Sequence, residues 1–316
     1  MKIVMLDGYT TNPGDLSYDV FKSFGEFIYY DRTEKTKAGV LEKAKDADLI
    51  ITNKTPITAD IIDELTSCKY IGLMSTGFDA VDVKAARKKG ITVCNVPTYT
   101  TDAVAQMTFA LILALYNKAE HHSNLVHSGA WSSCPDFCFW DSPLSELRGK
   151  TIGLFGFGKI AKAVADVALA FKMNVIAYSR SPFEYNGVES VSFEDLLKNS
   201  DILSLHAPFN EQTNLIINAN TIDKMKNGAL LINTARGKLV DDKALAQALK
   251  NGKIRGAGLD VLTVEPPTDN PLFGLENCII TPHISWAAVE TRERLVGIVA
   301  KNIENFLNGT PQNEVF

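Results

Sequence analysis

The segment "GLFGFGKIA" (residues 153–161) decides the fold of this 316-residue chain. Gly156, Gly158 and Ala161 fit the pattern G-x-G-x-x-[G/A], directly after a strand-like run and at the start of a helical one. In this pattern the first glycine permits a tight turn, the second lets the backbone approach a pyrophosphate, and the third small residue lets the helix pack on the strand. The pyrophosphate lies at the helix N-terminus, where unpaired N–H groups point toward it. We therefore predict a dinucleotide site whose turn residues are Gly156, Gly158, Lys159 and Ile160.

Short apolar runs fill the chain ahead of this turn. They are "KIVML", "EFIYY", "DLIIT", "YIGLM" and "ITVCNV" over residues 2–96, and a helix-like stretch follows each of them. Five buried-type strands with helical crossovers predict a parallel sheet covered on both faces. Pro97 ends this unit, which makes residues 1–98 a domain of their own.

The same alternation returns after residue 150. The expected strands are "TIGLF", "NVIAY", "ILSLH", "ALLINTA", "GAGLDV" and "CIITP". An apolar helix over residues 101–117, with Asp102 as its N-cap, precedes them, and an amphipathic helix over about residues 287–307 follows them. The predicted fold is α/β with two doubly wound parallel-sheet domains and an active-site cleft between them. A flavodoxin-like substrate domain comprises residues 1–98 and 287–316, and a Rossmann cofactor domain comprises residues 99–286.

Composition excludes several classes of partner. Hydrophobic residues make up 46%, charged residues make up 22%, and the net charge is −5 without any basic cluster, so we expect no nucleic-acid partner. The apolar run at residues 109–116 is shorter than the ~18 residues of a membrane span, so no membrane partner is expected. Met1 leads directly into a strand without a signal peptide, and the five cysteines form no CxxC pair, so we expect reduced thiols and a cytoplasmic location. The cysteine and histidine spacing matches no zinc pattern, and no metal site is predicted.

The end of the next strand after the turn indicates which dinucleotide is bound. An acidic residue there would bind the ribose 2′-hydroxyl of NAD, but the segment "AYSRS" places Ser179 and Arg180 at this point. Because no carboxylate is present there, nothing at this position would repel a 2′-phosphate, and Arg180 could pair with one. An arginine solvated at a strand end would look the same. NADP(H) is therefore favoured, and NAD(H) remains open.

Three polar residues follow the later strands. Arg236, Glu265 and His283 each come after an apolar run, where open α/β sheets bind ligands. Singly, they could be a salt-bridge arginine, a solvated acid and a boundary histidine. Together they match what reduction of a 2-keto acid requires: a guanidinium to hold the carboxylate, an imidazolium to donate a proton, and a carboxylate to orient the imidazole.

The chain resembles the D-isomer-specific 2-hydroxyacid dehydrogenases over nearly its whole length. The resemblance is carried by "STGFDAVD", "TDAVAQM", "GFGKIA", "HAPFNEQT", "NTARGKLVD", "GLDV", "VEPP" and "PHIS". It implies that Arg236, Glu265 and His283 are catalytic and that the turn at Ser75, Thr76 and Gly77 holds the substrate carboxylate. It also implies cofactor contacts at Ala207, Pro208, Thr213, Thr234, Ala235, Arg236, Asp260 and His283. Gln106 stands where the family usually has a glutamate.

Two further stretches narrow the expected substrate. "LDGYTTNPGDLSY" and "CPDFCFWD" are similar to the glycerate dehydrogenase (hydroxypyruvate reductase) group, which implies reduction of hydroxypyruvate or glyoxylate to D-glycerate or glycolate. Another 2-keto acid, such as pyruvate or phenylpyruvate, stays open. The fold also includes corepressors that sense dinucleotides without a catalytic role, but those carry extra peptide-binding segments that this chain lacks.

The resemblance also implies a homodimer. Residues 117–143 are expected to form a long loop that carries Trp131, Phe137, Phe139 and Trp140 and crosses to a partner. The loop could instead fold back on its own cofactor domain and bury these rings there.

Overall fold

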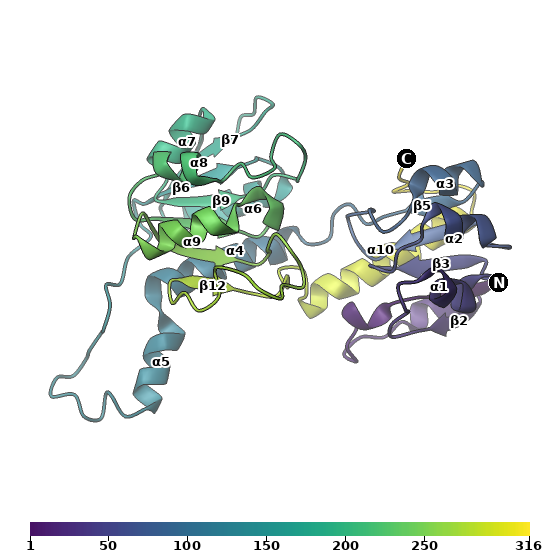
Figure 1. The fold of residues 1–316 in the computed structure, drawn as a ribbon, viewed down its shortest axis with the longest axis horizontal. Helices are drawn as coiled ribbons and strands as arrows, with labels where there is room; N and C mark the ends of the chain where they lie inside the picture. The colour runs from purple at the N-terminus through teal and green to yellow at the C-terminus, as the bar shows by residue number, and fades with distance from the viewer. The chain divides into compact units, whose positions relative to one another are not determined.

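The chain folds into two compact units. The computed structural model describes all residues 1–316, with Met1–Thr100 and Trp286–Phe316 in the first unit and Thr101–Ser285 in the second (Figure 1). The sequence placed these boundaries at 98/99 and 286/287. Each unit contains one parallel sheet with helices on both of its faces, which confirms the predicted fold class of two parallel-sheet α/β domains.

The first unit contains a five-stranded sheet. Its strands are β1 (Lys2–Met5), β2 (Glu26–Tyr29), β3 (Leu49–Thr52), β4 (Tyr70–Leu73) and β5 (Thr92–Cys94). Their order is β2-β1-β3-β4-β5, the flavodoxin order, and every neighbouring pair is parallel. β3 and β4 are buried along their whole length, as strands covered on both faces must be.

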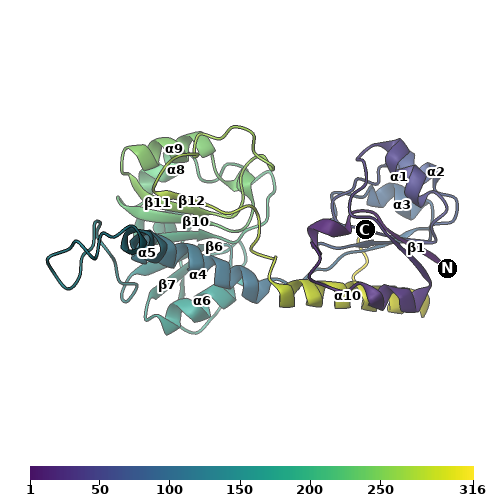
Figure 2. The same ribbon diagram turned by 90° about the horizontal axis from the view of Figure 1, so that it is seen from below.

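Helices cover the two faces of this sheet with different sets of apolar side chains. One core forms beneath α1 (Lys37–Ala44), α2 (Ala59–Glu64) and α3 (Val83–Lys88). The other forms beneath α10 (Val289–Leu307), which packs on the opposite face (Figure 2). The C-terminal residues then return to the sheet edge, where the Val315 N–H donates to the Val93 carbonyl.

The connection from β1 to β2 differs from the expected α-helix. It contains two short 3₁₀ helices, η1 (Gly8–Thr10) and η2 (Asp19–Phe24). Between them the Asn12 side-chain oxygen accepts hydrogen bonds from the Gly14 and Leu16 N–H groups, and Gly14 has a φ of +122°. Local side-chain bonds of this kind compete with helix formation, which explains the difference.

The second unit contains a seven-stranded parallel sheet in the order β12-β11-β10-β9-β6-β7-β8. Its strands are β6 (Thr151–Phe155), β7 (Asn174–Tyr178), β8 (Val188–Ser190), β9 (Ile202–Leu205), β10 (Ala229–Asn233), β11 (Ile254–Leu259) and β12 (Cys278–Ile280). Counted from β6, this is the Rossmann order 3-2-1-4-5-6 with one further strand beyond it. The order reverses beside β6, so the glycine turn that follows β6 lies at the topological switch point.

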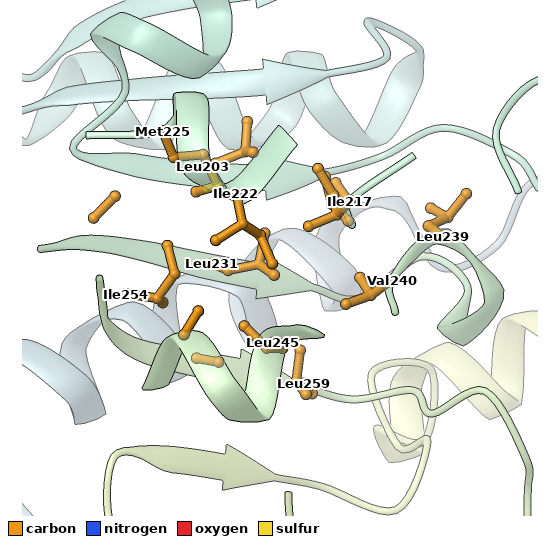
Figure 3. Packing of buried hydrophobic residues seen from close by; sticks show 14 of the residues in the cluster. Leu203, Ile217, Ile222, Met225, Leu231, Leu239, Val240, Leu245, Ile254 and Leu259 are labelled. Carbon is orange, nitrogen blue, oxygen red and sulfur yellow. The ribbon is translucent and has the colours of Figure 1, made fainter. Parts of the chain in front are cut away.

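Five helices cover this second sheet. On one face lie α4 (Thr101–Asn117) and α6 (Lys159–Ala170), and on the other lie α7 (Phe193–Asn199), α8 (Ala219–Lys224) and α9 (Asp242–Lys250) (Figure 2). Figure 3 shows the apolar core between the sheet and the helices α7, α8 and α9. In this core Ile222 and Leu245 pack toward Leu231 of the sheet. α4 has the predicted bounds, but Asp102 lies within its first turn and does not precede it as an N-cap.

The segment after α4 was predicted as a loop, and this is wrong for its first part. Ala119–His127 form the helix α5, which projects from the second unit together with the loop after it (Figures 1 and 2). The Asp141 carboxylate lies 2.5 Å from His121 Nε2 and 3.5 Å from His122 Nε2, so it ties the returning loop to α5.

Candidate active site

The glycine turn after β6 has the shape that a dinucleotide requires. Gly156 has a φ of +88°, and a Cβ there would lie 2.9 Å from the Ala207 nitrogen, so only glycine fits. Gly158 is the N-cap of α6, and a Cβ on it would meet no atom within 4 Å. No side chain caps this helix end. Open space beside uncapped N–H groups suits a pyrophosphate, and the residues present therefore fit the cofactor.

The end of β7 carries the two residues that face the ribose in this fold. Ser179 is half-buried, whereas Arg180 is exposed and forms no hydrogen bond or ion pair. A solvated arginine without a protein partner retains all its donors for a phosphate.

The segment after β9 forms the wall of the turn. Ala207 is buried against Gly156, and Pro208 is exposed. The Thr213 hydroxyl accepts from the Asn210 N–H and lies within hydrogen-bonding distance of the Pro208 carbonyl, so it stabilises this loop. Burial lowers the pKa of His206 to about 4, which keeps this imidazole neutral. Its Nε2 lies 2.9 Å from the Ser204 hydroxyl.

Asn233, at the end of β10, shapes the turn that presents Arg236. The buried Asn233 side chain accepts from the Ala235 N–H at 3.0 Å and donates to the Arg236 carbonyl at 2.9 Å. Thr234 is held from α4, because its hydroxyl lies 3.2 Å from that of Thr108. Arg236 is exposed and donates only to the Ala235 carbonyl. The sequence reasoning missed Asn233, although an asparagine that ends an apolar strand is a recognisable turn former.

His283 and Glu265 form a close pair in the second unit. His283 Nδ1 lies 2.7 Å from Glu265 Oε2, while Glu265 Oε1 accepts from the Leu262 N–H at 3.0 Å. Partial burial alone would raise the pKa of Glu265. The hydrogen bonds from His283 and Leu262, together with the positive charges of His283 and Arg236, outweigh burial and hold the pKa below its usual value. An ionised carboxylate therefore orients the imidazole and fixes the proton on Nδ1.

Asp260, at the end of β11, anchors the loop that carries His283. Its buried carboxylate accepts from the Thr281 hydroxyl, the Ile284 N–H, and both the N–H and the hydroxyl of Ser285. His283 has a φ of +55°, which is uncommon for a residue other than glycine, and its N–H donates to the Asp260 carbonyl at 2.8 Å. This loop stores backbone strain at the proposed proton donor, and Asp260 supports it.

The turn expected to hold the substrate carboxylate follows β4 in the first unit. The Ser75 hydroxyl donates to the Gly77 carbonyl at 2.6 Å, and that of Thr76 to the Val96 carbonyl at 2.7 Å. The backbone N–H groups of Ser75, Thr76 and Gly77 donate to no protein acceptor. Consecutive unpaired amides form a concave site that suits an anion.

These features define a class of protein. A Rossmann sheet with a dinucleotide turn at its switch point is typical of the cofactor domain of a nicotinamide-dependent oxidoreductase. Residues 109–285, more than half of the chain, match the family model of the D-isomer specific 2-hydroxyacid dehydrogenase NAD-binding domain. The chain belongs to the D-isomer-specific 2-hydroxyacid dehydrogenase family, as its sequence motifs predict.

Full-length relatives support this assignment. The chain is 45% identical to the hydroxypyruvate reductase of Blautia hydrogenotrophica, over 100% of this chain and 99% of the relative. It is 38% identical to the glycerate dehydrogenase of Methylorubrum extorquens, over 99% and 98% of the two chains. Among solved structures, the acyclic imino acid reductase Bsp5 in complex with NADPH and D-Arg is 35% identical with a TM-score of 0.86, and each chain is covered completely.

Proposed function

We propose that this dehydrogenase reduces hydroxypyruvate or glyoxylate to D-glycerate or glycolate with a nicotinamide dinucleotide. The observation that carries the proposal is the 2.7 Å pair of His283 and Glu265, in the unit that contains the dinucleotide turn. The similarity to a hydroxypyruvate reductase and a glycerate dehydrogenase supports the substrate class. Glyoxylate has the same adjacent carbonyl and carboxylate, and it lacks only the hydroxymethyl group.

His283 is the proposed general acid and base. Because Glu265 holds Nδ1, proton exchange with the substrate oxygen is assigned to Nε2. A bound nicotinamide supplies the hydride. The negative charge of Glu265 stabilises the imidazolium before it donates, and in the reverse direction the neutral ring accepts the proton from the hydroxyl.

Arg236 and the Ser75–Gly77 amides are the proposed groups that bind the substrate carboxylate. A planar guanidinium forms two parallel hydrogen bonds with a carboxylate, and it also polarises the neighbouring carbonyl. The amides add donors that no protein acceptor uses. Each of these groups favours 2-keto acids over aldehydes and ketones that lack a carboxylate.

The enzyme is expected to prefer NADPH. Arg180 is exposed without a protein partner and Ser179 carries no charge, so a 2′-phosphate would meet attraction without repulsion. We expect Arg180→Ala to raise the KM for NADPH about tenfold and to leave that for NADH unchanged, while Ser179→Asp shifts preference toward NADH. The measurement is initial-rate oxidation of both cofactors with hydroxypyruvate, glyoxylate, pyruvate and phenylpyruvate as substrates.

This assay decides between the alternatives. If pyruvate or phenylpyruvate were turned over faster than hydroxypyruvate and glyoxylate, the proposed substrate would be wrong and the faster acid would replace it. A wild type that uses NADH at least tenfold better than NADPH would contradict the cofactor preference. Absence of turnover with every 2-keto acid would favour a dinucleotide-sensing role.

The homodimer is part of the same proposal. Phe137 is 89% exposed, Trp140 65% and Trp131 50%, so these rings do not fold back to be buried in their own unit, as the alternative required. Exposed aromatic rings on an ordered projection are typical of an interface. We propose that residues 117–143 bury them against a second copy of the chain.

Sedimentation velocity tests the dimer. We expect the wild type to sediment as a dimer at micromolar concentration and Trp140→Ala to weaken the association, because truncation of a buried interface ring typically costs more than 1 kcal/mol. Phe273→Ala, at an exposed ring elsewhere in the same unit, is the matched control. A monomeric wild type would contradict the dimer. A Trp140→Ala dimer as tight as the control would exclude this ring from it.

None of the helices combines the length and the hydropathy that a membrane span requires. The cytoplasmic location stays a prediction from the sequence.

A further inference from the structure

The carboxyl ends of β1, β3 and β4 share one edge of the five-stranded sheet, and two groups of backbone amides lie along it. The first group follows β3, where the N–H groups of Asn53, Lys54 and Thr55 all donate to the Asp7 carboxylate at 2.6–2.8 Å. The second group is the Ser75–Gly77 turn after β4, whose N–H groups have no protein acceptor. A buried side chain of the protein therefore fills the first amide group, and the second remains available for an external anion.

Asp7 makes the loop after β3 rigid. This residue is 8% exposed, and it accepts a fourth hydrogen bond from the Thr52 hydroxyl at 3.0 Å. The Asn53 amide also donates to the Thr10 hydroxyl at 3.0 Å. Since all three backbone N–H groups and two side chains are fixed, Lys54 projects from a loop with little freedom.

The pairing of β3 with β4 brings the loop that carries Lys54 beside the unfilled amides. Thr52 pairs with Leu73, and the Met74 N–H donates to the Thr52 carbonyl at 2.8 Å. The loop that begins at Asn53 and the turn that begins at Ser75 therefore leave neighbouring strands at the same edge of the sheet. Neighbouring strands are about 4.8 Å apart, so an ammonium on a four-carbon stem can reach an anion bound to the turn.

A negative charge beside the turn favours a cation there. Asp79 follows the turn, and its Oδ2 would lie 3.7 Å from a Cβ on Gly77. A carboxylate this close opposes the binding of a second carboxylate. Lys54 is exposed and forms no ion pair, so its charge is not neutralised by the protein.

We propose that Lys54 is a substrate-binding residue that pairs with the carboxylate of the 2-keto acid at the Ser75–Gly77 turn, and that Asp7 positions it. The inference rests on the proposed function, because it takes the 2-keto acid as the anion. It adds to the amide donors a cation that offsets Asp79, and it makes this edge of the first unit select for negatively charged substrates.

Steady-state kinetics of Lys54→Met tests the proposal. We expect the KM for hydroxypyruvate to rise about tenfold or more with kcat changed less than about threefold, since an ion pair to the carboxylate is lost in both the ground and transition states. Lys54→Arg should recover most of the affinity. The Kd of NADPH, measured by fluorescence, should stay at the wild-type value. Lys88→Met on α3 of the same unit is the matched control for loss of one exposed positive charge.

Each other outcome overturns the proposal. An unchanged KM in Lys54→Met would exclude the contact, and an equal rise in Lys88→Met would mean general attraction by net charge. A weaker Kd of NADPH in Lys54→Met, together with a KM that Lys54→Arg does not restore, would overturn it by assigning the loss to a wider perturbation of the protein. Failure of the proposed function would be separate, since it would show as absent turnover in the wild type.

Discussion

Replacing His283 with alanine should lower kcat for 2-keto acid reduction by about 10²- to 10⁴-fold, the range expected for a positioned general acid. The side chain exchanges a proton only as the reaction proceeds, so the Kd of NADPH should remain that of the wild type. Stopped-flow measurement of a single turnover separates this chemical step from product release. His127→Ala, at an exposed histidine at the end of α5, is the matched control. A His283→Ala enzyme with more than a tenth of wild-type kcat would remove this residue from the chemistry.

The partner of His283 gives this prediction a pH dependence. The pKa of Glu265 lies below its usual value, so its carboxylate stays ionised above that lowered pKa and loses its charge as the pH falls through it. In Glu265→Gln a neutral amide replaces the carboxylate that would stabilise a positive charge on the imidazole. The alkaline limb of the reduction profile should therefore move to lower pH, with a fall in kcat. If kcat/KM of Glu265→Gln followed the wild-type pH profile, the 2.7 Å pair would have no role in protonation.

The main elements of the fold could be predicted because each central strand is a continuous apolar run. All five strands of the first unit and six of the second lie where such runs predict them. β8 was not predicted because it is three residues long and mostly exposed, so its sequence contains no apolar run. α5 escaped for a similar reason, since it buries no residue.

The candidate site was predictable where a rule relates sequence to position. Arg236, Glu265 and His283 stand after strands of one parallel sheet, so the carboxyl edge collects them. No such rule predicts the residues that hold these three in position by hydrogen bonds. Asp260 holds residues 281–285 only because β11 and β12 pair with Leu259 beside Ile280, a register that no local pattern specifies.

Lys54 shows the same limit in the first unit. Its place beside the Ser75–Gly77 turn depends on the pairing of β3 with β4, and its fixed backbone depends on the hydrogen bond that its N–H donates to Asp7, 47 residues earlier. Contacts between residues so distant in the sequence come from the folded sheet, whereas the turn at Gly156 is visible in nine consecutive letters.

Replacing Arg236 with lysine should raise the KM for the 2-keto acid and lower kcat together. Lysine keeps the charge but has no planar fork, so it cannot form two parallel hydrogen bonds to the carboxylate or polarise the carbonyl from the same position. A hydrogen bond to a charged group contributes about 1.5–3 kcal/mol, and each 1.4 kcal/mol is a factor of ten, so kcat/KM should fall about 10- to 100-fold.

The surroundings of Arg236 indicate that the fall in kcat/KM would come from weaker substrate binding and not from a less stable protein. Arg236 is exposed and donates only to the Ala235 carbonyl, so Arg236→Lys breaks no ion pair, and its Tm should match that of the wild type. Arg148→Lys, at an exposed arginine of the same unit without a partner, should change neither KM nor kcat. Wild-type kinetics in Arg236→Lys would show that the guanidinium does not bind the carboxylate.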